Sequence, residues 1–115
     1  MAWTKSKAGG YTKYTQDLAS TAADTITLAG AGALITTVAD AKVSTASSEL
    51  DASDAYTYEL LETTAAGQIF SIPGGAHMLK LEDVTGGGVV TVYVENSAMG
   101  QDTAGMTNGI GADPS

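Results

Sequence analysis

Cysteine and arginine are both absent from the 115 residues of this chain. Without cysteine, disulfides and thiolate metal sites are excluded. With no arginine, and with five lysines against thirteen acids, the chain is poor in the cations that proteins use to neutralise nucleic-acid phosphates. We therefore expect no nucleic-acid partner.

Long apolar runs are also missing. No stretch is long enough and apolar enough to span a bilayer, and the segment from Met1 to Lys5 leads into no apolar signal segment. The sequence thus predicts neither a membrane span nor a cleaved export signal.

Histidine occurs once, as His77. A Ser-His-Asp triad would depend on that residue alone, and no nucleophile is marked beside it. One histidine without cysteine cannot supply the ligands of a typical zinc site. We expect no catalytic residue, no metal site and no cofactor, and hence a protein that is not an enzyme.

Acids and glycines that could mark other sites do not have the required spacing. Glu59 and Glu62 are close in sequence, but a chain with a single tryptophan offers a sugar few rings to stack on. The acids between Glu49 and Asp54 lack the EF-hand spacing, which favours a solvated acidic loop. The turn at 30–32 lacks the third glycine of a dinucleotide fingerprint.

The clearest structural pattern lies between residues 68 and 96. Runs at 68–72, 77–82 and 89–95 are separated by glycine-rich turns, and in the last run Val90, Val92 and Val94 alternate with polar residues. That period of two is typical of half-buried strands. We interpret the segment as a three-stranded antiparallel meander with Leu79 and Leu81 on its apolar face.

Further strands are predicted at 24–28, at 34–38 and within 55–66, with a long surface loop over 39–55. Short strands, glycine-rich turns and the lack of a helical pattern predict an all-β fold, a small antiparallel β-sandwich or barrel. We divide the chain into an extended N-terminal arm (1–16), a β domain (17–96) and a glycine-rich C-terminal tail (97–115).

Charge is distributed unevenly along the chain. Residues 1–16 hold three lysines and no acid, whereas residues 17–115 hold two lysines and all thirteen acids, so the arm carries +3 and the rest −11. A basic arm on an acidic body favours docking of the arm on an acidic partner. The alternative is a solvated, frayed terminus.

Large aromatic side chains accompany the lysines of the arm. Aromatic side chains anchor interfaces because they bury much area at low entropic cost. The predicted partner-binding residues are Trp3, Lys5, Lys7, Tyr11, Lys13 and Tyr14. The alternative is that the aromatics cover one edge of the sandwich.

The opening Met1-Ala2-Trp3-Thr4, the run from Lys80 to Val92 and the overall composition resemble the capsid decoration (cement) proteins of tailed bacteriophages. The shared features are a small acidic β domain without cysteine, a polar aromatic arm before it and a glycine-rich tail after it.

This resemblance implies a virion protein, often a homotrimer, that binds the major capsid protein on the outer face of the shell and stabilises it. The arm would lie against the shell and add a strand or pack its aromatics there. An alternative is a carbohydrate- or receptor-binding module of a head fibre or tail, for which Tyr56, Tyr58 and Tyr93 are the candidate contacts. A small hydrolase that depends on His77 is a third class.

Overall fold

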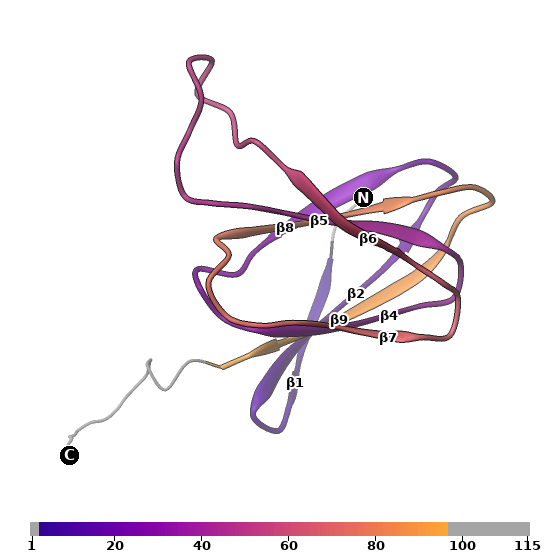
Figure 1. The fold of residues 1–115 in the computed structure, drawn as a ribbon. Helices are drawn as coiled ribbons and strands as arrows, with labels where there is room; N and C mark the ends of the chain where they lie inside the picture. Colours follow the sequence, from indigo (N-terminus) through magenta and orange to yellow (C-terminus); the bar gives the residue numbers. More distant parts are fainter. Residues whose placement is uncertain (1–2, 97–115) are drawn as a thin grey trace.

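Nine antiparallel strands in two layers make up the part of the chain that the computed structural model describes, residues 3–96 (Figure 1). The strands are β1 (Thr4–Ala8), β2 (Tyr11–Leu18), β3 (Ala23–Thr27), β4 (Ala33–Thr37), β5 (Ala41–Ala46), β6 (Glu59–Thr64), β7 (Ile69–Ile72), β8 (Met78–Asp83) and β9 (Gly88–Glu95). Sheet A has the order β1-β2-β9-β4-β7, and sheet B has the order β3-β8-β5-β6. The predicted all-β sandwich is confirmed.

The strand pairs are nested about the centre of the chain. β5 pairs with β6, β4 with β7, β3 with β8 and β2 with β9, all antiparallel. The chain therefore runs as one long hairpin that folds over on itself, and its strands are shared between two sheets. This is the topology of an eight-stranded jelly roll. β1 is an addition to it, a ninth strand at one edge of sheet A.

The predicted meander over 68–96 is wrong. β7 and β9 both lie in sheet A, on either side of β4, while β8 lies in sheet B. The turn after Ile72 carries the chain across to the other sheet, and Gly74 is so close to the Gly30 carbonyl oxygen that a Cβ there would lie 2.8 Å from it. Alternation of apolar residues has the same period whether successive strands pair or face each other across a sandwich.

The predicted inner faces of these strands are confirmed. Val90, Val92 and Val94 of β9 meet Leu79 and Leu81 of β8 in the core between the sheets. Ile72 is buried with them, and Phe70 packs against them half-buried. Each sheet thus contributes one apolar face, and exclusion of these faces from water stabilises the pair of sheets.

The predicted separate arm is also wrong. Residues 4–8 and 11–18 are strands of sheet A, joined by the two-residue turn Gly9-Gly10, in which Gly9 has a φ of +64°. β2 pairs with β9 from Tyr11 to Leu18, so a boundary at residue 16 would cut through a strand. Successive lysines and threonines hid this strand because they dilute its apolar alternation.

Other strands also begin or end at residues different from those predicted. The strands predicted at 24–28 and 34–38 are β3 and β4, each displaced by one residue. β5 lies inside the predicted loop over 39–55 and was missed because its inner face is built mainly of alanine and valine. β6 begins at Glu59 instead of residue 55. The predicted tail over 97–115 lies outside the described residues.

Candidate functional site

The β1–β2 hairpin carries the predicted partner-binding residues but divides them between two faces. On β2, Tyr11 and Lys13 alternate with Thr12 and Tyr14, and the register to β9 puts Tyr14 opposite the buried Val92. Lys5 and Lys7 of β1 lie opposite Tyr14 and Thr12, hence on that same inner side. Tyr11 and Lys13 belong to the outer face of sheet A.

Trp3 and Tyr14 close an open side of the sandwich. The Trp3 ring meets the Tyr14 ring edge-on at a centroid distance of 6.4 Å, and both pack against the core. Trp3 Nε1 donates a 2.9 Å hydrogen bond to the Thr25 carbonyl oxygen of β3, which ties the chain ahead of β1 to the opposite sheet. For these two residues, the alternative reading that aromatics cover an edge of the sandwich is confirmed.

Tyr11 and Lys13 belong to a broad exposed surface, which we call the outer face of sheet A. Tyr11 packs edge-on against Tyr93 of β9 at 6.3 Å, and the Lys13 ammonium lies 6.0 Å from the centre of the Tyr93 ring. Beside Tyr93, a hollow of about 240 Å³ is lined by Leu34, Ile69 and their neighbours on β4. Apolar and aromatic atoms thus extend from β2 to β7.

Several apolar side chains on this face are highly exposed to solvent. Ile69 is 74 % exposed, Val38 is 70 % exposed and Val89 is 36 % exposed. The strand registers place Ile69 next to Thr36, and Val38 bonds through its backbone to Val89. Contiguous exposed apolar surface of this kind marks interaction sites.

Sequence reasoning missed these residues because it assigned only one apolar face to each strand. The available signal was the occurrence of adjacent apolar residues, as in Leu34-Ile35 and Ile69-Phe70. One member of each pair must point away from the core of a two-layer sandwich.

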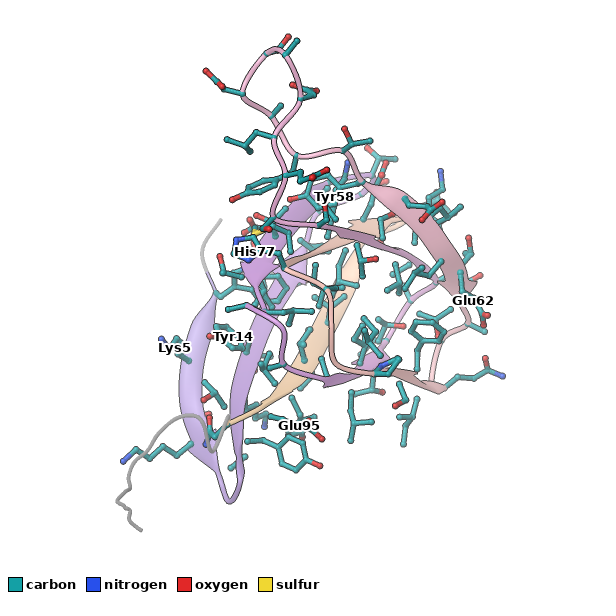
Figure 2. All side chains as sticks on the ribbon, turned by 60° about the vertical axis from the view of Figure 1, so that its left-hand side comes forward. Lys5, Tyr14, Tyr58, Glu62, His77 and Glu95 are labelled. Carbon is teal, nitrogen blue, oxygen red and sulfur yellow. The ribbon has the colours of Figure 1, made fainter. Side chains whose placement is uncertain are left out.

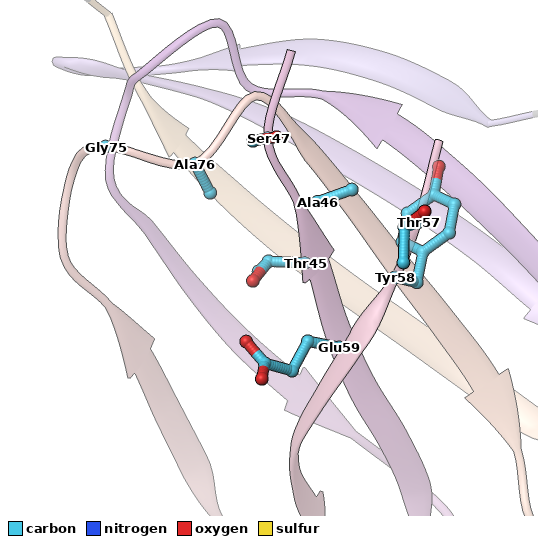
Figure 3. Close-up of a pocket in the computed structure, with 8 residues that line it drawn as sticks. All are labelled: Thr45, Ala46, Ser47, Thr57, Tyr58, Glu59, Gly75 and Ala76. Carbon is cyan, nitrogen blue, oxygen red and sulfur yellow. The ribbon is translucent and has the colours of Figure 1, made fainter. Parts of the chain in front are cut away.

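A second feature lies at the base of the loop 47–58, which projects from sheet B (Figure 1). An open pocket of about 500 Å³ lies between β5, the start of β6 and the turn at Gly75-Ala76 (Figure 3). Tyr58 borders it, and its ring contacts Tyr56 edge-on at 6.5 Å. The Lys80 ammonium lies 5.3 Å from the centre of the Tyr58 ring.

Tyr56 also packs on the single histidine, His77, with ring centroids 5.6 Å apart. Burial raises the pKa of Tyr58 above its usual value of 10.0, and the neighbouring Tyr56 adds to the shift. The Tyr56 ring thus contacts both Tyr58 and His77, and of these three residues Tyr58 lines the pocket.

Two acids, Asp83 and Asp51, accept hydrogen bonds from backbone amides. Asp83 is buried, and its Oδ2 accepts backbone hydrogen bonds from Thr21 at 3.2 Å and Gly87 at 2.9 Å. Asp51 Oδ1 accepts bonds from the backbone of Ser53 and Ala55 and so shapes the tip of the loop. Both carboxylates hold turns in place.

Within residues 3–96, no three histidine or acidic side chains are grouped closely enough to hold a metal ion. The same residues include no helix with the length and apolar character needed to cross a membrane.

No protein-family model matches the chain, and no curated protein matches it. Solved structures with the same fold include protein NMB1881 from Neisseria meningitidis, with a TM-score of 0.52 and 12 % identity over 82 % of this chain and 83 % of that one. A protein of unknown function from Rhizobium leguminosarum has a TM-score of 0.53 and 19 % identity, over 82 % of this chain and 79 % of that one.

Oxalate oxidase in complex with glycolate has a TM-score of 0.50 and 19 % identity, over 75 % of this chain and 42 % of that chain. This chain therefore spans less than half the length of the oxidase. Similarity at such identities establishes a shared fold and transfers no activity.

Proposed function

We propose that this chain is a non-enzymatic structural protein of a tailed-bacteriophage virion that binds the major capsid protein and stabilises the capsid shell. The observation that carries the proposal is the outer face of sheet A. It presents Lys13, Tyr93 and Leu34 in one row across three strands, with Tyr11 packed against Tyr93 and Ile69 in the next row. Of the predicted partner-binding residues, Tyr11 and Lys13 contribute to this contact directly.

The distribution of acids also supports docking with sheet A against the shell. Asp17 and Glu95 lie at the two ends of the outer face of sheet A, opposite Val89 and Tyr11. Sheet B and the loop 47–58 carry Glu82 and a larger group of exposed acids, namely Glu49, Asp51, Asp54, Glu59 and Glu62. Docked through sheet A, the subunit would turn its acidic side to solvent, where charge keeps proteins soluble.

The stabilisation would follow from linkage. A ligand that binds the assembled shell but not its free subunits shifts assembly by mass action, and needs no reaction to do so. Aromatic side chains with few charges beside them are typical of interface centres, where a few contacts supply most of the binding energy.

The test is cosedimentation of the purified protein with empty capsids built from the major capsid protein of the same genome. Ile69→Asp introduces a charge at a highly exposed position, so the domain should fold while binding weakens at least about tenfold. Leu50→Asp, on the loop 47–58, is the matched control and should bind like wild type. Equal binding by both variants would refute docking through sheet A, and no binding by wild type would refute the function.

A second candidate function is binding of a carbohydrate or receptor beside Tyr56 and Tyr58, favoured by the open pocket that Tyr58 borders. A glycan array tests it: wild type should bind a defined glycan, and Tyr58→Ala should lose that signal. An array without binding would leave the capsid proposal standing alone.

A further inference from the structure

Two strands at the margins of the sandwich carry opposite charge. β1 is one of the two edges of sheet A and holds Lys5 and Lys7. β6 is one of the two edges of sheet B and holds Glu59 and Glu62. The side chains of residues 4–7 and 59–63 are all exposed. Among residues 3–96, each edge has one strand neighbour, which leaves the backbone groups along its other side available for pairing with another chain.

The charged pairs also have the same spacing. Lys5 and Lys7 face partners two positions apart on β2, namely Tyr14 and Thr12. Glu59 and Glu62 are three apart in sequence, yet they face Thr45 and Val43, again two positions apart, because a bulge near Leu61 removes one residue from the ladder. Without that bulge, Glu59 and Glu62 would point to opposite faces.

The two pairs lie on equivalent sides of their sheets. Glu62 is opposite Val43, a core residue of sheet B, and Lys5 is opposite Tyr14, whose ring packs on the core from sheet A. If β1 of one copy lay beside β6 of another with the core-facing sides of the two sheets turned the same way, both lysines and both glutamates would fall on the same side of the joined sheet. Opposite charges across neighbouring strands stabilise the pairing and select the partner.

The other two edges are less suited to pairing. β7 is four residues long and is followed directly by Pro73, which lacks a backbone donor. On β3, the Thr25 carbonyl oxygen already accepts the hydrogen bond from Trp3 Nε1.

We propose that a second copy of this chain is the partner of these edges: β1 of one copy pairs with β6 of the next through Lys5, Lys7, Glu59 and Glu62. Lys5 and Glu62 lie at opposite margins of the molecule (Figure 2), so the contact is head-to-tail. Such contacts repeat from copy to copy and form a ring when the rotation closes. This interface is separate from the outer face of sheet A and does not depend on the capsid proposal.

The experiment is sedimentation equilibrium of the full chain up to millimolar concentration. Wild type should self-associate, and K5E/K7E and E59K/E62K should each associate at least about tenfold more weakly, because each places like charges opposite one another. The quadruple variant, which reverses both edges, should recover the wild-type association. Circular dichroism melting controls for folding.

Wild type that stays monomeric throughout this range, or a folded quadruple variant that fails to recover, would overturn the proposal. Because the chain has no cysteine, a second measurement avoids charge reversal altogether. In a chain carrying S6C and L60C, a short bismaleimide should link copies into oligomers. In a chain carrying S6C and L50C it should not, and equal yields from the two would also count against the pairing.

Discussion

Three of the five lysines hold their ammonium group over a tyrosine ring: Lys5 over Tyr14, Lys13 over Tyr93 and Lys80 over Tyr58. Contacts of this kind are worth about 0.5–1 kcal/mol at exposed sites. They fix the direction of side chains that would otherwise move freely. The hairpin lysines therefore present defined positions to a partner.

Val92 tests the residue-level account of the core. Its side chain is 0 % exposed, between β2 and β4 in sheet A. We expect Val92→Ala to lower the free energy of unfolding by about 1–3 kcal/mol, because it leaves a cavity in a packed interior. Urea denaturation measures this. Val89→Ala, on the outer face of the same strand, is the control and should change stability by less than about 0.5 kcal/mol.

Ionisation of Tyr58 makes the free energy of unfolding depend on pH in the alkaline range. Its pKa is raised above 10.0 by burial, so above pH 10 the unfolded chain releases this proton before the folded one does. The stabilisation is fully present below pH 10 and is lost as pH rises through the folded pKa. The urea midpoint of wild type should therefore fall more steeply above pH 10 than that of Tyr58→Phe. Parallel curves for the two proteins would contradict this.

At the scale of elements, the turn between β8 and β9 depends on glycine geometry. Gly86 and Gly87 have φ angles of +86° and +76°; a Cβ on Gly86 would meet nothing, whereas one on Gly87 would lie 2.9 Å from the Leu18 carbonyl oxygen. The Gly87 amide also donates to the buried Asp83. This turn locks two loops together at one end of the sandwich.

We expect Gly86→Ala to cost about 1–2 kcal/mol, the strain of a positive φ at a residue with a Cβ. Gly87→Ala adds a backbone clash and should cost about 3 kcal/mol or more. Thermal and urea unfolding of the two variants give the comparison. A Gly87 variant no less stable than the Gly86 variant would show that the close approach to Leu18 is wrong.

Strands with large apolar side chains at alternate positions were predictable from the sequence. Strands in which lysines or small alanines obscure that alternation were not. β9 shows three valines at alternate positions, so its inner face was correctly predicted. β1 and β2 were not recognised as strands, since Lys5, Lys7 and Lys13 interrupt them. β5 was hidden by Ala41 and Ala46, which are buried but weakly apolar.

Which sheet each strand belongs to could not be predicted from the sequence, for a different reason. Apolar alternation does not distinguish a turn that joins neighbours in one sheet, such as Gly9-Gly10, from one that crosses between sheets, such as the segment after Ile72. The residues of the candidate site were predicted only in part for the same reason. Tyr11 and Lys13 were predicted, but Leu34, Ile69 and Tyr93 join them only through strand pairings far apart in sequence.

At the scale of the whole molecule, the jelly roll needs β2 to β9 and β1 is peripheral. Deleting residues 1–8 should leave a folded protein of lower stability, because Trp3 and its bond to Thr25 are lost. Deleting residues 1–18 removes β2 and leaves one side of β9 unpaired, so it should abolish cooperative unfolding. Circular dichroism and urea titration check both truncations. A cooperative transition in the longer deletion would show that β2 is dispensable.

The first and last strands of the roll are neighbours, and Thr12 bonds to Asn96 across 84 positions of sequence. Closing so long a loop is slow, so we expect refolding on the millisecond-to-second scale of high-contact-order domains. During synthesis, the middle of sheet A stays empty until the residues of β9 have emerged from the ribosome. Sheet A of this chain therefore cannot be completed before β9 has been synthesised.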